Sequence, residues 1–114
     1  MVEYDSQQLD NVFKALADPT RREMLGLLVN KKSCTISELA EPFSISFAAT
    51  SKHVKVLEKA GLLSRKIVGR THLCTFSSGS LAEAEHWISY YRDFWHKRLN
   101  ALESLLKQEG ELND

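Results

Sequence analysis

The chain has 114 residues, of which 43% are hydrophobic and 26% are charged, and its formal net charge is zero. This length accommodates one domain, and the composition is that of a globular protein rather than a disordered one. No apolar run approaches the roughly 18 residues of a membrane span, and the N-terminal segment carries acidic side chains where a signal peptide has an apolar core. We therefore expect a single cytoplasmic domain over residues 1–114, without membrane contact.

The basic residues are concentrated in one segment. Between Ser44 and Phe76 there are six basic residues and one acidic residue, Glu58, whereas the rest of the chain has nine basic and fourteen acidic residues. The segment thus has an excess of five positive charges, which the remainder balances. This segregation is typical of a protein with a phosphate-binding face, although a solvated charge run would give the same count.

The first half of the chain predicts three helices. Apolar residues at positions 9, 12, 13, 16 and 17 have the spacing of one buried helical stripe. Asp18-Pro19 ends this helix and begins the next, with Asp18 as N-cap and Pro19 in the first turn. The second helix is expected over about residues 19–29, with Met24, Leu25, Leu27 and Leu28 on its apolar side. Thr35 and Glu38 form a capping-box pattern before a short third helix that buries Ile36, Leu39 and Ala40.

A fourth helix is expected from Ser46, as N-cap, to Ala60, with Gly61 as a left-handed C-cap. Ala49 or Thr50, together with Val54 and Leu57, should point inward. Two short helices joined by a turn form a helix-turn-helix. The outer face of the fourth helix then consists of Phe47, Ala48, Ser51, Lys52, Lys55 and Lys59.

Two segments rich in β-branched and apolar residues, Leu62–Val68 and Thr71–Phe76, flank Gly69-Arg70 and predict a hairpin. A hairpin directly after the helix-turn-helix is a wing. The fold class is therefore mainly α with a β-hairpin wing: a winged helix-turn-helix of five helices and two strands.

The last helix is expected from Ser80 to about Lys107. At ~1.5 Å per residue it is roughly 40 Å long, more than so small a domain can cover. Its apolar residues, spaced three or four apart, need another surface, and a two-fold interface with a second copy supplies one. We expect an obligate homodimer through the first and last helices. The residues of this stripe include Trp87, Tyr91, Phe94, Trp95 and Leu102.

The fourth helix and the wing have the residues that duplex DNA requires. Small or polar side chains allow a helix to approach base edges in the major groove, and cations meet the phosphates. A turn tip with a basic side chain can enter the minor groove, and Arg70 is the preferred candidate. The candidate DNA-binding residues are Ser46, Phe47, Ala48, Ser51, Lys52 and Lys55 on the helix, and Arg65, Lys66, Arg70 and His72 in the wing.

The runs LDNVFKALADPTRREMLGLL and TISELAEPFSISFAATSKHVKVLEKAGLLSRKIVGRTHLCTF, with the aromatic last helix, resemble the ArsR-type winged helix-turn-helix repressors over nearly the whole chain. The resemblance implies a dimer that places the helix containing SKHVKVL in the major groove of a palindromic operator. It also implies repression of the protein's own operon and release of DNA when an effector binds. The effector is not evident from the sequence.

The metal-sensing patterns of that family are missing. Thr35 and Ser37 stand where metal sensors have a Cys-x-Cys pair, and neither supplies a thiolate. On the last helix Ala84 replaces the aspartate of a zinc motif. His86 and His96 lie about 80° apart around that helix and roughly 15 Å along it, so one chain cannot bring both to one ion. We expect no metal site and no cofactor, and a cross-dimer site using either histidine is the open alternative.

Three other interpretations of the sequence are less well supported. The sequence has no HExxH, GxSxG, GxGxxG or P-loop motif, so we expect no catalytic residues and no enzyme. A winged helix can serve as a protein-interaction module, but the cations on the fourth helix favour DNA. The two cysteines, Cys34 and Cys74, lack CxxC spacing and predict two reduced thiols, with a redox-responsive repressor as the alternative.

Overall fold

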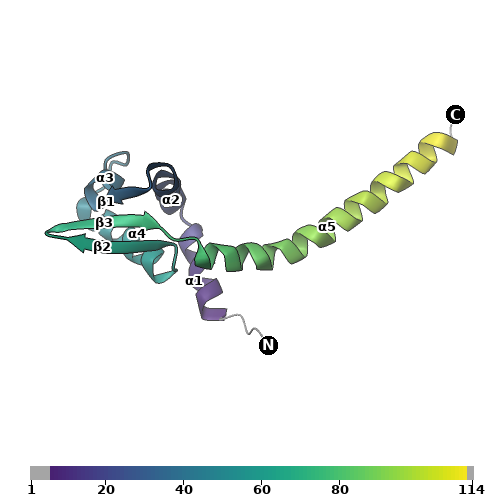
Figure 1. The fold of residues 1–114 in the computed structure, drawn as a ribbon. Coiled ribbons are helices and arrows are strands. Elements are labelled where there is room, and N and C mark those ends of the chain that lie inside the picture. The colour runs from purple at the N-terminus through teal and green to yellow at the C-terminus, as the bar shows by residue number, and fades with distance from the viewer. Residues whose placement is uncertain (1–5, 113–114) are drawn as a thin grey trace. The chain divides into compact units, whose positions relative to one another are not determined.

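The structure, a computed structural model, describes residues 6–112. Within these residues there are five helices and three strands (Figure 1). The chain divides into two compact units, Met1–Ala84 and Glu85–Asp114. The elements in chain order are α1 (Ser6–Leu16), α2 (Pro19–Lys31), β1 (Ser33–Thr35), α3 (Ile36–Ala40), α4 (Phe47–Lys59), β2 (Leu63–Val68), β3 (Thr71–Phe76) and α5 (Gly79–Leu112).

The junction between α1 and α2 is as the sequence predicts. Asp18 is the N-cap of α2, and its Oδ2 accepts a 3.0 Å hydrogen bond from the backbone N–H of Arg21. This hydrogen bond is the main reason why the pKa of Asp18 lies below its usual value. The predicted inward position of Ala17 is wrong, because α1 ends at Leu16 and Ala17 is exposed. Ala15, which the predicted stripe omits, is fully buried instead.

The sheet has three strands rather than the two expected. The hairpin pairs Leu63 with Phe76 and Val68 with Thr71, as predicted. The additional strand, β1, pairs antiparallel with β3, so that the order is β1-β3-β2. Three residues with one apolar side chain are too short for the alternating pattern that identifies a strand in sequence. Thr35 ends this strand and also caps α3, with both hydrogen bonds of the capping box present.

The hydrophobic core lies in the first unit and draws on every element up to the first residues of α5. The fully buried Met24 and Leu28 of α2 meet Val54 and Leu57 of α4 in this cluster. The open choice between Ala49 and Thr50 is resolved for Thr50, whose hydroxyl donates to the carbonyl of Ser46 at 2.9 Å. The core therefore fixes which face of α4 points outward. Its buried members are Val12, Ala15, Met24, Leu25, Leu28, Cys34, Ile36, Leu39, Val54, Leu57, Ala60, Leu62, Leu63, Cys74 and Ala84.

Gly61 closes α4 in the left-handed conformation predicted for it, with φ at +75°. A Cβ at this position would collide with the Ser80 hydroxyl, whereas Gly69, at φ +64°, has open space around it. We expect Gly69→Ala to cost about 1–2 kcal/mol for the left-handed backbone alone. Gly61→Ala should cost at least about 1 kcal/mol more, because Ser80 must also move.

Urea unfolding of both variants at one protein concentration measures this difference. Since Gly69→Ala controls for backbone strain, equal losses would contradict the close packing of Gly61 against Ser80.

Candidate nucleic-acid interface

The outer face of α4 is exposed as predicted. Ser46 is the N-cap of this helix, and its hydroxyl accepts a 3.1 Å hydrogen bond from the backbone N–H of Ala49. Among the predicted residues Ser51 is half-buried, and the others on the helix are exposed, namely Phe47, Ala48, Lys52, Lys55 and Lys59. The helix therefore presents small side chains near its start and cations further along.

Arg21 of α2 connects this helix to both α1 and α4. Its guanidinium donates from Nε to the carbonyl of Ala15 at 2.8 Å and from Nη2 to that of Lys14 at 3.0 Å. Nη1 lies 3.2 Å from Nδ1 of His53 on α4. A guanidinium has no acceptor, so the imidazole nitrogen accepts this bond. His53 therefore has a hydrogen-bonding role between α4 and α2.

The wing, defined as the β2–β3 hairpin, projects beyond the helices of the first unit (Figure 1). Lys66 and Arg70 are exposed on it. Side chains alternate between the two faces of a strand, so Lys66 lies on the opposite face from Arg65. Two of the predicted cations are therefore exposed on the wing: Arg70 at the turn and Lys66 on the face opposite Arg65.

Arg65 and His72 lie differently from the other predicted site residues. The side chain of Arg65 is only 15% exposed, and its Nη2 forms a 3.1 Å ion pair with Oε1 of Glu58 on α4. Its Nη1 lies 3.4 Å from Nδ1 of His72, and its buried Nε has no partner among the described residues. Arg65 thus connects the wing to α4 through Glu58.

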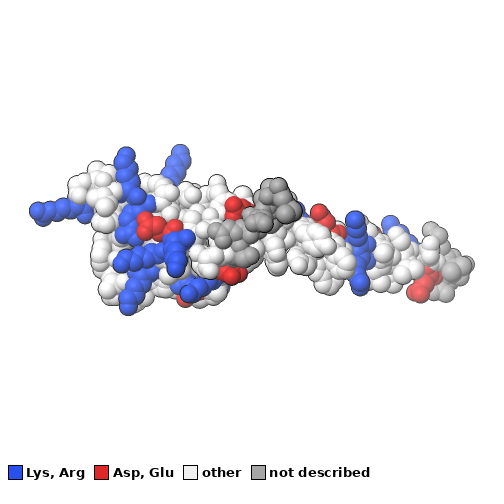
Figure 2. Space-filling model, turned by 90° about the horizontal axis from the view of Figure 1, so that it is seen from below, with Lys and Arg blue, Asp and Glu red and all other residues white. Residues whose placement is uncertain are grey.

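Basic side chains gather on one face of the first unit. Figure 2 shows this face, where most of the charged groups are blue. The exposed cations of α4 and the wing, Lys52, Lys55, Lys59, Lys66 and Arg70, belong to the segment with the excess of five positive charges. The electrostatic footprint that the sequence predicts is therefore exposed on the surface.

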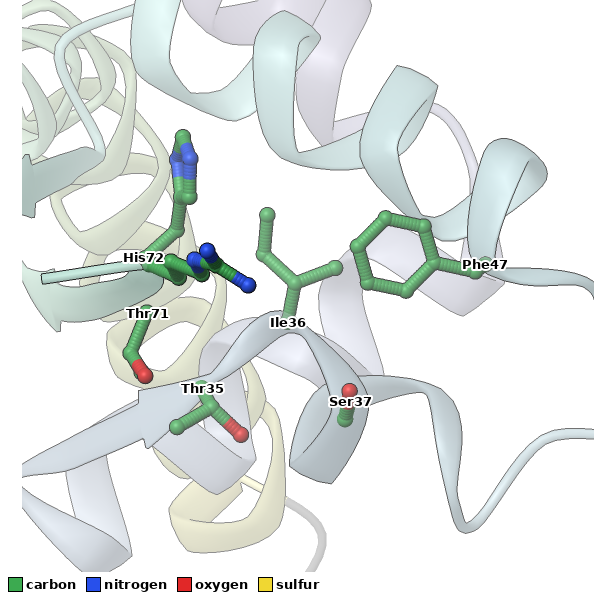
Figure 3. A pocket seen from close by; sticks show the side chains of 7 residues that line it. Thr35, Ile36, Ser37, Phe47, Thr71 and His72 are labelled. Atoms are coloured by element: carbon green, nitrogen blue, oxygen red, sulfur yellow. The ribbon is translucent and has the colours of Figure 1, made fainter. Parts of the chain in front are cut away.

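The structure brings three of the predicted residues, Phe47, Arg70 and His72, to one open pocket of about 300 Å³. In Figure 3, Ile36 lies between Phe47 of α4 and the wing residues Thr71 and His72. Sequence reasoning missed the other lining residues because β1, whose pairing with β3 brings them there, was not predicted. Those residues are Thr35, Ile36, Ser37 and Thr71.

Cys34 and Cys74 stand directly opposite one another in β1 and β3, and both are buried. Burial raises the pKa of both thiols. A thiol with a raised pKa forms little of the thiolate that reacts with oxidants. The geometry thus favours two packed thiols over a redox sensor.

Among residues 6–112, no three His, Cys, Asp or Glu side chains come together in a way that could hold a metal ion. His86 and His96 are both exposed on α5. No helix in the same residues has the length and apolar character of a membrane span.

A capped helix-turn-helix, an exposed basic recognition helix and a hairpin wing define a winged helix-turn-helix DNA-binding protein. A family described as a helix-turn-helix domain matches residues 16–65. The transcriptional repressor SdpR of Bacillus subtilis (strain 168) is 34% identical over 80 residues, which are 70% of this chain and 88% of the relative.

Two solved structures of transcriptional regulators are also similar to this chain. An ArsR family transcriptional regulator is 35% identical, with a TM-score of 0.75 over 84% of this chain and 97% of that one. An ArsR-like transcriptional regulator from Rhodococcus sp. RHA1 is 29% identical, with a TM-score of 0.67 over 87% and 92% of the two chains. The chain belongs to the ArsR family of winged helix-turn-helix transcriptional regulators. It is a DNA-binding regulator and not an enzyme.

Proposed function

We propose that this protein is a cytoplasmic repressor that binds a palindromic operator as a homodimer. The observation that carries the proposal is the exposed outer face of α4, where Lys52 and Lys55 follow the small residues of the first turn. Phe47, Ala48 and Ser51 would contact base edges in the major groove, and the two lysines would contact phosphates. SdpR, the curated relative described above, is itself named as a transcriptional repressor.

The wing supplies the second contact of this proposal. Arg70 at the turn would reach the minor groove, with Lys66 on the phosphates beside it. Arg65 and His72 belong to the same contact surface, and the ion pair of Arg65 with Glu58 would hold the wing at a fixed distance from α4. Ser46 would contact a phosphate at the start of the helix.

A homodimer is proposed because many apolar side chains of α5 are exposed to solvent. Trp95 is 62% exposed and Leu102 is 53% exposed, and the side chains near them have similar values. A groove of about 450 Å³ lies along this helix at Ala101, between Trp95 and Leu105. Its position suits a side chain of a second copy, and a patch this apolar is characteristic of an interface. The other exposed large apolar residues of α5 are Trp87, Ile88, Tyr90, Tyr91, Phe94, Leu99, Leu105 and Leu106.

We further propose that the regulator does not sense metal through the positions used by metal-sensing relatives. The hydroxyls of Thr35 and Ser37 replace soft ligands there, and the Thr35 hydroxyl already caps α3. Addition of zinc or arsenite in equimolar amount should leave an operator complex intact.

The operator can be selected from fragments of the source genome with the full-length protein and then mapped by footprinting. The proposal predicts two protected half-sites related by two-fold symmetry and one helical turn apart, about 10 base pairs from centre to centre. Recovery of no preferred fragment, with capture of a protein instead, would favour the protein-interaction module.

A further inference from the structure

The C-terminal end of α4 contacts two other helices through one side chain. Nε2 of Gln8, on α1, donates a 2.7 Å hydrogen bond to the carbonyl oxygen of Ala60, which is the C-cap of α4. The same nitrogen donates a 3.0 Å hydrogen bond to Oγ of Ser80, in the first turn of α5. A carbonyl oxygen only accepts hydrogen bonds, so the atom facing it is the amide nitrogen of Gln8. Gln8 thus connects α4 to both terminal helices.

The surroundings of this junction leave little space. Ala60 is fully buried, and the last carbonyl groups of a helix have no partner within that helix. Since a buried carbonyl without a hydrogen bond is unfavourable, the Gln8 amide stabilises the end of α4 in its present position. A Cβ on the neighbouring Gly61 would lie 3.2 Å from Nε2 of Gln8 and would collide with the Ser80 hydroxyl. The end of α4 therefore has little freedom to shift relative to α1 and the start of α5.

α1 is connected to α4 at a second place. The Arg21 guanidinium bridges the last carbonyl groups of α1 and His53, in the middle of α4. His53 and Ala60 are seven residues apart, or about 10 Å along the helix axis. Apolar contacts have no preferred direction, whereas hydrogen bonds weaken steeply when their angle changes. Two directional connections at this separation fix the angle between α1 and α4 and not only the distance between them.

We propose that Gln8 is a positioning residue that sets how far apart the two copies of α4 lie in the dimer, and thereby which half-site spacing the protein accepts. This role rests on the proposed function, in which the terminal helices form the two-fold interface. The position of each α4 relative to the two-fold axis then depends on its connections to those helices. Gln8 supplies the connections at the C-terminal end of α4, and it acts on DNA binding only through that helix.

The test compares three operators, whose half-sites are separated by the preferred number of base pairs, by one more and by one fewer. One base pair moves a half-site by about 3.4 Å along the DNA and turns it by about 35°. By fluorescence anisotropy, the wild type should lose at least about tenfold in affinity at either altered spacing. Gln8→Met keeps the length of the side chain and removes both hydrogen bonds. In this variant the penalty should be smaller by at least about threefold, the equivalent of one hydrogen bond.

Gln7→Met is the matched control. Gln7 is exposed, and its amide donates a 3.2 Å hydrogen bond to Oδ1 of Asn11, within α1. This variant should keep the spacing preference of the wild type. Ser80→Ala removes only the acceptor on α5, and it should reduce the penalty by a smaller factor than Gln8→Met. It also tests the junction if Gln8→Met fails to fold.

Hydrogen exchange of the protein without DNA separates a positioning role from a loss of the fold. The amides of Gly61 and Leu62 bond to carbonyl groups of α4, and they should exchange faster in Gln8→Met, while the amides that pair β2 with β3 exchange as in the wild type. Faster exchange with an unchanged spacing penalty, or an equal effect of Gln7→Met, would overturn the role of Gln8 alone. A wild type that binds all three operators equally would contradict the palindromic operator of the proposed function, and this role with it.

Discussion

Leu102→Glu is expected to convert the proposed homodimer into a monomer and to lower operator affinity at least about 100-fold. The side chain of Leu102 is 53% exposed and borders the apolar groove of α5. In the proposed dimer, the substituted carboxylate would be buried against apolar surface without a partner, at a cost of several kcal/mol. A monomer holds only one half-site, so the gain from binding two linked half-sites disappears.

Sedimentation equilibrium and operator titration measure the two effects. Ser104→Glu is the matched control, because it places the same charge two residues further along, about 200° around the helix. This variant should remain dimeric and bind as the wild type does. A dimeric Leu102→Glu variant, or one with unchanged affinity, would contradict the proposed interface on α5.

The double substitution Lys52→Glu and Lys55→Glu is expected to reduce operator affinity about 100-fold or more. Both side chains are exposed on α4 and have no ion-pair partner among the described residues. Reversal of their charges replaces phosphate attraction by repulsion in both subunits, while the core behind the helix stays intact. The unfolding midpoint in urea should therefore stay within the range of surface substitutions.

The control for this variant is Lys97→Glu with Lys107→Glu. These lysines are exposed on α5, and the pair changes the net charge by the same amount. If both double variants weaken DNA binding equally, the effect belongs to net charge and not to the outer face of α4.

Local side-chain chemistry made most of the fold predictable. Asp18, Thr35 and Ser46 each cap a helix through a hydrogen bond to a backbone N–H three residues on, and such bonds involve only neighbours in sequence. The hairpin bounds were predicted within one residue, since Gly69 marks its turn with a positive φ. Buried and outward residues of α4 followed from helical spacing.

Contacts between distant segments were not predictable in the same way. β1 is defined by its partner β3, about 40 residues later, and its three residues have no period of their own. The pocket was not predictable for the same reason, because Ser37 and Thr71 line one pocket only through that pairing. For Arg65, sequence indicated a free cation, whereas Glu58 occupies its guanidinium seven residues away on another element.

The assignment of the whole chain to one domain with its interface on the terminal helices stays a prediction. The exposed apolar residues of α5 support it, because one helix alone cannot bury them. Local spacing identified this stripe, but the partner that covers it lies outside one chain.

The salt dependence of operator binding tests the central claim most directly. The logarithm of the association constant is plotted against that of salt concentration between about 50 and 200 mM, for the wild type and for Lys52→Ala with Lys55→Ala. The account predicts a steep negative slope for the wild type. In the variant the slope should be smaller by about 3 to 4, because the dimer loses four phosphate contacts. A slope near zero, or the same slope for both proteins, would contradict the assignment of α4 to the DNA interface.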